Sequence, residues 1–200
     1  MTENKNIVLF LGCSGVGKSS LIRALCTQFY EVYEYVKPYT TRDIRMGEND
    51  KSHISREVFL SLVKKRVIIC PNDIDSNLYG PSKRNIEDII EKGLVPVLDW
   101  PVDKINQLRR ELESFSLINI YILPPNREIL KERLEKDKRD TRNERYRTAL
   151  IELDMIKEKA YDDQIDIFFI NEGELIENAL KIHSMIPKIN IHKDGNRRNG

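Results

Sequence analysis

Several features that mark whole classes of protein are missing from this sequence. Cysteine occurs only as Cys13, Cys26 and Cys70, an odd number whose spacing fits neither a zinc site nor a disulfide framework. No run of 18 apolar residues is present, so we expect no membrane-spanning helix and no membrane partner. The first residues, MTENKN, lack the basic and apolar regions of a secretory signal. We therefore expect reduced thiols and a cytoplasmic protein.

An excess of charge of one sign is also missing. The 33 lysines and arginines balance 32 aspartates and glutamates, and the net charge of +1 argues against a nucleic-acid partner. Hydrophobic residues make up 40% of the chain, which is typical of a globular domain. We expect one domain over residues 5–186 and a frayed polar C-terminal tail over 187–200. The oligomeric state is left open.

Short apolar runs alternate with segments of helical periodicity. The expected strands cover residues 6–11, 66–70, 94–98, 117–123 and 165–170. The expected helices cover residues 19–29, 55–65, 81–92, 101–113, 126–136, 143–160 and 173–185. Residues 39–52 interrupt the alternation and are expected to form a charged loop. The pattern predicts an α/β fold of the P-loop NTPase type, a parallel sheet flanked by helices.

A phosphate-binding motif follows the first strand. The segment from Gly12 to Ser19, GCSGVGKS, matches G-x-x-x-x-G-K-[ST]. Such a loop wraps phosphates with backbone N–H groups at a helix N-terminus. We expect the lysine to reach the β- and γ-phosphates of ATP and Ser19 to bind Mg²⁺. The ATP-binding residues predicted here are Gly12, Ser14, Gly15, Val16, Gly17, Lys18, Ser19 and Ser20. A glycine-rich turn between an ordinary strand and helix is the alternative.

One carboxylate ends another apolar strand. Asp99 follows the run LVPVL, residues 94–98, and resembles a Walker B acid. Ligands of open α/β sheets bind at the carboxyl ends of strands, which favours a role beside Mg²⁺. An aspartate that merely begins a turn is the alternative.

The sequence after the P-loop resembles the guanylate kinase family. The segment TTRDIRMGE, residues 40–48, is similar to the family signature T-T-R-x-x-R-x-G-E, and further similarity extends from about residue 7 to 185. The resemblance implies a core, an acceptor-binding lobe over about 37–80 and a helical lid over about 137–147. It also implies ATP and Mg²⁺ as cofactors and a small-molecule phosphate acceptor, a nucleoside monophosphate, as partner.

The resemblance implies a role for individual residues. Arg42, Arg45 and Tyr79 would hold the acceptor phosphate, with Glu48 and Asp99 beside them. Lid arginines would close over the transferring phosphoryl group; Arg139 and Arg147 align best, and Arg142 or Arg145 are the alternatives. A solvated basic helix face is also compatible with this cluster. Asn171 would lie near the adenine, unless it only terminates a strand.

This chain departs from the family at the positions that read guanine. Pro38 replaces a serine, Ile69-Cys70 stands where a glutamate is usual, and Pro101 replaces the second aspartate of L-D-I-D. Asp73, Asp75 or Asp103 could substitute. We therefore expect weak discrimination for guanine, or a different acceptor.

The most direct interpretation is a guanylate kinase-type enzyme that converts ATP and GMP or dGMP into ADP and GDP or dGDP. A kinase of a phosphorylated sugar, similar to ribose 1,5-bisphosphate phosphokinases, is one alternative. A non-catalytic guanylate kinase-like interaction module is another, although such modules typically lose the P-loop lysine, which this chain retains as Lys18.

Overall fold

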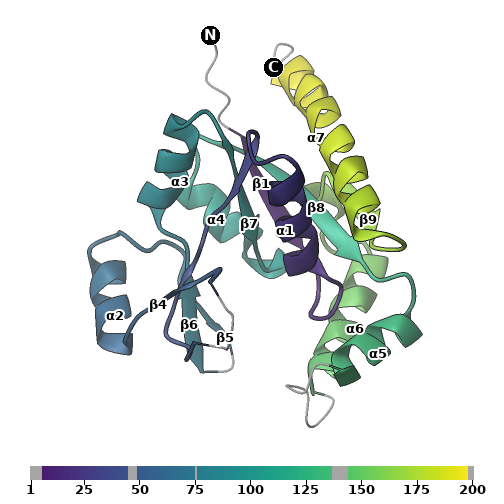
Figure 1. The fold of residues 1–200 in the computed structure, drawn as a ribbon, viewed down its shortest axis with the longest axis horizontal. Coiled ribbons are helices and arrows are strands. Elements are labelled where there is room, and N and C mark those ends of the chain that lie inside the picture. Colours follow the sequence, from purple (N-terminus) through teal and green to yellow (C-terminus); the bar gives the residue numbers. More distant parts are fainter. Residues whose placement is uncertain (1–5, 45–48, 75, 137–143, 198–200) are drawn as a thin grey trace.

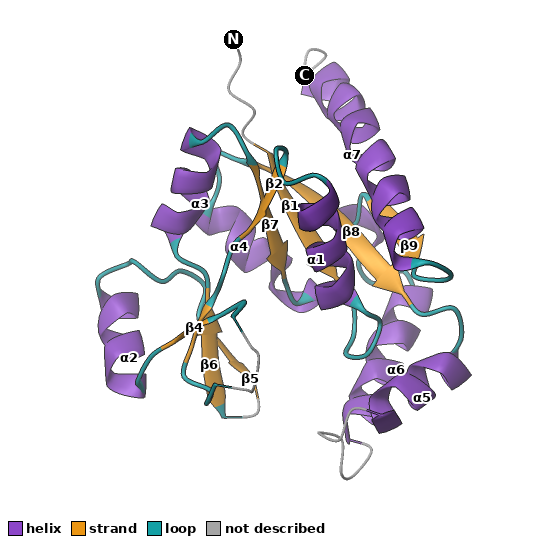
Figure 2. Ribbon diagram, in the orientation of Figure 1, coloured by secondary structure: helices purple, strands orange, loops and turns teal. Residues whose placement is uncertain are grey.

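A five-stranded parallel sheet forms the centre of the computed structural model, which describes residues 6–44, 49–74, 76–136 and 144–197 (Figures 1 and 2). Its strand order is β2-β7-β1-β8-β9. The strands are β1 (Asn6–Leu11), β2 (Tyr33–Tyr35), β7 (Val95–Asp99), β8 (Ser116–Leu123) and β9 (Ile167–Ile170). The predicted α/β class with a parallel sheet is confirmed.

Helices cover both faces of this sheet. On one face Val8 and Phe10 of β1 pack against α1 (Lys18–Gln28) and α7 (Leu175–Arg197). On the other face Ile7 and Leu9 pack against α3 (Lys83–Glu91) and α4 (Ile105–Glu111). Successive strand residues point to opposite faces, so a strand between two helical layers must be apolar throughout. This requirement explains the unbroken apolar run of β1.

A second, smaller sheet lies beside the core, within residues 39–80 (Figure 2). Its strand order is β4-β3-β6-β5, and helix α2 (Arg56–Lys64) packs against it through Phe59, Ile68 and Leu78. The strands are β3 (Tyr39–Thr40), β4 (Ser52–His53), β5 (Asn72–Ile74) and β6 (Asn77–Gly80). These strands have two to four residues, which is too few to show a period. The sequence therefore predicted a loop over 39–52, where the structure has β3.

Residues 66–70 do not form the predicted strand. Arg66 and Cys70 both have positive φ, 58° and 46°, and Ile68 makes only an isolated bridge with Ser82. The left-handed conformation at both ends prevents an extended ladder. The apolar character of this run instead serves burial, since Ile68, Ile69 and Cys70 are all less than 6% exposed.

The remaining helices follow the prediction closely, except at the C-terminus. Helices α5 (Arg127–Lys136) and α6 (Glu144–Lys157) lie at one end of the molecule, and two 3₁₀ turns cover Val102–Lys104 and Asp162–Gln164. Helix α7 continues past Pro187 to Arg197, within the stretch for which we expect a polar tail. A helix that has started gains one hydrogen bond per added residue and needs no apolar face to continue. No helix in the described part of the chain is long and apolar enough to cross a membrane.

Candidate active site

The P-loop joins β1 to α1 and depends on its glycines. Gly12, Gly15 and Gly17 have φ values of 131°, 86° and 95°, a region that side chains disfavour. A Cβ on Gly12 would also lie 2.6 Å from the backbone oxygen of Ile122 in β8. The glycines therefore allow the loop to turn tightly over the end of the sheet and to leave its N–H groups at the start of α1.

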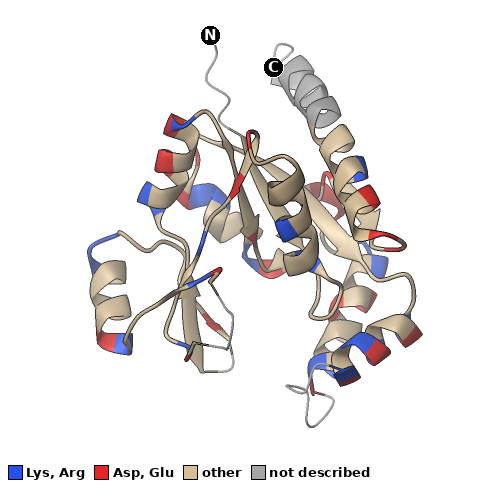
Figure 3. Ribbon diagram, viewed as in Figure 1, with Lys and Arg blue, Asp and Glu red and all other residues tan. Residues whose placement is uncertain are grey.

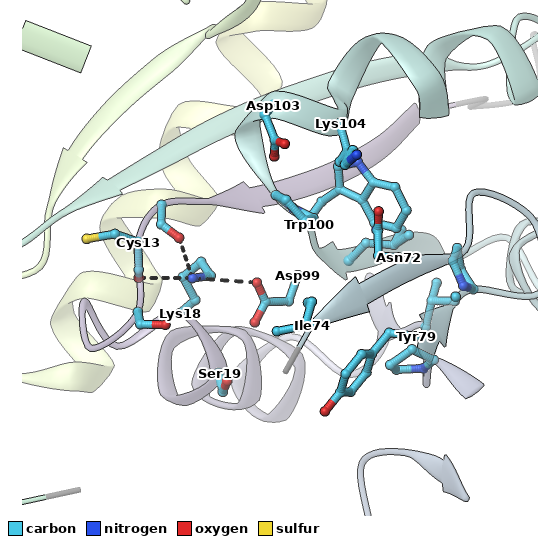
Figure 4. Close-up of a pocket in the computed structure, with 18 of the residues that line it drawn as sticks. Cys13, Lys18, Ser19, Asn72, Ile74, Tyr79, Asp99, Trp100, Asp103 and Lys104 are labelled. Atoms are coloured by element: carbon cyan, nitrogen blue, oxygen red, sulfur yellow. Dashed lines mark hydrogen bonds and ion pairs between the residues drawn. The ribbon is translucent and has the colours of Figure 1, made fainter. Parts of the chain in front are cut away.

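Lys18, the first residue of α1, turns its side chain back over this loop (Figure 4). Its Nζ donates to the Gly12 oxygen at 2.5 Å and to the Cys13 oxygen at 3.1 Å. Nζ also lies 3.7 Å from Asp99 Oδ1, and the lysine side chain is 13% exposed. The ammonium group is thus held at the mouth of the loop, where its charge can meet a phosphate.

Asp99 reaches the same place from the neighbouring strand. It is the last residue of β7 and pairs in register with Phe10 of β1, and Trp100 N donates to the Phe10 oxygen at 3.0 Å. Its carboxylate and the Ser19 hydroxyl line the same cavities. These hard oxygen donors suit Mg²⁺, which is usually held by one or two protein oxygens together with substrate phosphates. No group of three or more potential ligands occurs among the described His, Cys, Asp and Glu residues.

Two cavities meet at this point. A cavity of about 840 Å³ lies along the P-loop and α1 and includes Arg133, Asn171 and Gly173. A cavity of about 480 Å³ extends toward the smaller sheet and includes Pro38, Asn72 and Trp100. Their shared wall consists of Ser14, Lys18, Ser19, Lys51, Ile74, Tyr79 and Asp99. Both volumes fall within the range of about 300–1,000 Å³ that small-molecule sites occupy.

The smaller sheet contributes Tyr79 to the shared wall, and Arg42, just after β3, lines the larger cavity beside it. Arg42 Nε donates to the Tyr79 hydroxyl at 3.1 Å, and His53 Nδ1 lies 2.7 Å from the Arg42 oxygen. Tyr79 stands on β6 opposite Thr40 of β3, and Arg42 follows β3 in a loop, where its backbone N–H donates to the Thr40 hydroxyl at 3.2 Å. Four acceptor-binding residues were expected here: three from the signature, and Tyr79. The structure brings two of them together, Arg42 and Tyr79. The other two, Arg45 and Glu48, lie outside the described residues.

Asn171 lies against the P-loop, and both polar atoms of its side chain form hydrogen bonds. Its Nδ2 donates to the Val16 oxygen at 2.8 Å, and its Oδ1 accepts from Asn178 Nδ2 at 3.1 Å. Arg133 of α5 donates to the oxygens of both Val16 and Asn171, each at 3.3 Å. Sequence reasoning missed the parts played by Arg133 and Asn178. The family similarity that extends to about residue 185 includes Glu132-Arg133-Leu134 and was a signal for the first, and no signal indicated the second.

Glu152 of α6 is a second residue that sequence reasoning missed. Its Oε1 accepts from the Tyr121 hydroxyl at 2.7 Å, and both Glu152 and Thr148 line the smaller cavity. Burial is the main reason why the pKa of Glu152 is raised, while the Tyr121 hydrogen bond and the charge of Lys18 lower it. Burial also raises the pKa of the Cys13 thiol to about 12, so this P-loop cysteine is a neutral thiol at pH 7.

The lid arginines are only partly described. Arg139 and Arg142 lie outside the described residues, Arg147 is exposed on α6, and Arg145 lines the larger cavity. Along α5, Lys131 forms an ion pair with Glu135 at 3.8 Å and Lys136 with Glu132 at 4.0 Å. Basic and acidic residues therefore alternate on this helix (blue and red in Figure 3). Arg145, offered as an alternative, is thus the lid arginine that reaches a cavity among those described.

The residues that depart from the family's guanine-reading pattern lie either in the wall of the smaller cavity or in the core. Pro38 and Pro101 line the smaller cavity. Cys70 is 2% exposed and is not among the residues that line this cavity; it packs in the core cluster that also holds Leu98 and Trp100 of the cavity wall. The cavity wall therefore lacks a carboxylate at the two proline positions.

Comparisons with known proteins agree with one another. The profile of the family described as guanylate kinase matches residues 3–186. A guanylate kinase of Photorhabdus laumondii subsp. laumondii is 31% identical over 190 residues, which cover 90% of this chain and 86% of that protein. One from Prochlorococcus marinus subsp. pastoris is 28% identical over 191 residues, 91% of this chain and 98% of that protein. The crystal structure of guanylate kinase from Anaplasma phagocytophilum has a TM-score of 0.68 at 22% identity, covers 94% of this chain and 87% of that one, and thus shares the fold.

Proposed function

Because the chain belongs to the guanylate kinase family, we propose that it transfers the γ-phosphoryl group of ATP to GMP or dGMP. An oxygen of the acceptor phosphate attacks the γ-phosphorus, and the bond to the β-phosphate oxygen breaks to release ADP. The observation that carries this proposal is the pair of cavities with a common wall at Lys18, Ser19, Asp99 and Tyr79. A donor and an acceptor bound in the two cavities would meet at that wall, as in-line transfer requires.

The larger cavity is assigned to ATP. The backbone N–H groups of Gly15 to Lys18 would surround the phosphates, and the start of α1, with Ser19 and Ser20, would face them. On phosphate binding, Lys18 Nζ would exchange the Gly12 and Cys13 oxygens for phosphate oxygens. Asn171 supports this loop through Val16, so its part in ATP binding is to hold the loop in shape.

Ser19 and Asp99 are assigned to Mg²⁺. Both residues line both cavities, so they stand at the boundary between donor and acceptor. When bound, Mg²⁺ would neutralise charge on the phosphate oxygens and orient them. Asp99 Oδ1 also forms an ion pair with Lys18 Nζ at 3.7 Å, which keeps the lysine side chain at the boundary between the cavities.

The smaller cavity is assigned to the acceptor. Arg42 lines the larger cavity and donates to the shared residue Tyr79, so it would pair with the acceptor phosphate at the boundary, and Arg45 and Glu48 would complete this grip from the same signature. Arginine forks suit phosphate because they can donate two parallel hydrogen bonds. Arg139 and Arg147 remain the proposed lid arginines, and Arg145 joins them because it lines the larger cavity. Such a reaction uses the nucleotides of the cytoplasm, where we place the protein.

Coupled measurement of ADP release tests the proposal directly. The purified chain with ATP and Mg²⁺ is supplied with GMP, dGMP, AMP, UMP or CMP in turn, and Lys18→Ala serves as the blank. We expect GMP-dependent ADP release that the blank lacks. Release that is the same with and without every nucleoside monophosphate, or the same in the blank, would overturn the proposal.

A further inference from the structure

Two polar side chains in the smaller cavity have buried atoms without a hydrogen-bond partner. Asn72 of β5 is 7% exposed, and its Oδ1 has no partner among the described residues. Trp100, directly after β7, is 4% exposed, and its indole Nε1 also has none. Both residues line the cavity on the side away from Ser19 (Figure 4). Both atoms lie beneath the cavity surface, and because a buried polar group without a partner is costly, a side-chain rotation that gave either atom a partner in the adjoining cavity would be favourable.

The other polar side chains in this part of the cavity are exposed, including Lys104, which lies beside Trp100 (Figure 4). Pro38 and Pro101, the two departures from the family pattern that line the cavity, carry no side-chain donor or acceptor. Asp73 and Asp103 also line it, but both are exposed, so water already satisfies their carboxylates.

We infer that Asn72 reads the base edge of the acceptor, with the Trp100 N–H as a second donor. The inference rests on the proposed function, because the cavity is assigned to the acceptor on that ground. An amide carries one acceptor and one donor side by side, so it pairs with a base edge that offers the complementary pair. Guanine offers O6 beside N1–H, and the indole N–H can donate to a further acceptor on the base.

A neutral amide discriminates between bases less strongly than a carboxylate. By turning through half a rotation Asn72 exchanges its donor and acceptor, and it can then serve the 6-amino group and ring nitrogen of adenine. A carboxylate can only accept, which suits the adjacent N1–H and 2-amino donors of guanine and repels the adenine ring nitrogen. The protein should therefore use a purine monophosphate with a modest preference for GMP over AMP, below the roughly 10⁴-fold of a site built for strict hydrogen bonding.

Binding can be tested without turnover, because Trp100 is the one tryptophan in the sequence. GMP should change its emission in a saturable titration, whereas ribose 5-phosphate, which has the phosphate but no base, should leave it unchanged. Asn72→Ala should raise the Kd for GMP at least about fivefold while the protein stays folded by circular dichroism. An equal response to both ligands, or an unchanged Kd in the variant, would overturn the inference.

Substitution of the amide tests the selectivity. Asn72→Asp should raise the ratio of kcat/KM for GMP over AMP by about tenfold or more, and Asn72→Ala should bring that ratio close to one, with the KM for ATP unchanged in both. Asp73→Asn, at the next position of the same strand, changes the other candidate reader in the cavity wall, and on this inference it should move the ratio less than either Asn72 variant. If Asp73→Asn moves the ratio and the Asn72 variants do not, Asp73 is the reader and the inference fails, although the kinase proposal survives. Absence of turnover with every monophosphate would instead refute the proposed function, and the titration would still decide the inference.

Discussion

The Nζ of Lys18 lies 3.7 Å from Oδ1 of Asp99, and this contact marks the boundary between two cavities. The two residues come from different strands of one parallel sheet, since the P-loop follows β1 and Asp99 ends β7. The register that pairs Phe10 with Asp99 brings both to the carboxyl edge of the sheet. A cation and a carboxylate at one edge can bind a phosphate and a divalent cation, respectively.

We expect Lys18→Ala to lower kcat by at least about 10³-fold and to leave the fold intact. Removal of one preorganised charge on the transferring group can cost this much. The lysine contacts loop oxygens and Asp99, and it makes no core contact whose loss would unfold the chain. Turnover and circular dichroism on the same sample measure the two effects. Lys131→Ala, a substitution of an exposed lysine on α5, is the control, and near-normal turnover in the Lys18 variant would remove the kinase assignment.

Arg42→Ala should raise the KM for GMP by about tenfold or more, with less than a threefold change in the KM for ATP. Arg42 follows β3 of the smaller sheet, and its Nε donates to the Tyr79 hydroxyl at the boundary of the two cavities. Tyr79→Phe should reproduce part of the effect, because the guanidinium then loses its fixed partner. Separate Michaelis constants for the two substrates provide the measurement. A rise confined to the KM for ATP would show that the acceptor cavity has been assigned to the wrong ligand.

The long elements of this fold were predictable because each shows a clear period or a continuous apolar run. β1 and β8 are buried on both faces, and their sequences are apolar almost throughout. The P-loop and Asp99 could be placed because they follow such strands directly. Tertiary packing decided the cases that failed: residues 66–70 look like a strand, yet positive φ at Arg66 and Cys70 folds them against α2 and the core.

The site was predictable only where a motif names its residues. Lys18, Ser19, Asp99, Arg42 and Tyr79 come together as expected in the cavity walls. Asn72, Glu152 and Asn178 could not be found, because their importance comes from what they face in the folded chain. Asn72 lies on a three-residue strand with no recognisable pattern, and only its burial without a partner distinguishes it.

Asn171→Ala should lower the free energy of unfolding by about 1–3 kcal/mol and raise the KM for ATP. The Val16 oxygen would lose its donor at 2.8 Å and keep only the longer bond from Arg133 at 3.3 Å, and Asn178 would lose one of its two acceptors while it keeps the Glu172 oxygen. Urea unfolding measures the first effect and steady-state kinetics the second. Asn106→Ala, on exposed surface of α4, is the matched control. Loss of stability with an unchanged KM for ATP would mean that Asn171 does not shape the P-loop.

The last prediction concerns the pH dependence of stability, which Glu152 should influence. Burial raises the pKa of this carboxyl above its ordinary value of 4.5, so the folded chain keeps the proton at pH values where the unfolded chain has lost it. Below 4.5 the group is protonated in both states and costs nothing. As the pH rises past that value the unfolded state is favoured, and the free energy of unfolding falls until the pH passes the folded pKa.

Glu152→Gln should remove this contribution. The amide oxygen can still accept from the Tyr121 hydroxyl, as Oε1 does at 2.7 Å, but the side chain has no proton to lose. The difference in free energy of unfolding, variant minus wild type, should therefore increase from pH 4 to pH 8, because only the wild type loses stability through this carboxyl. Urea unfolding of both proteins at four pH values gives the difference, and the subtraction cancels every other titrating group. A difference that stays constant, or that decreases with pH, would show that the pKa of Glu152 is not raised in the folded chain.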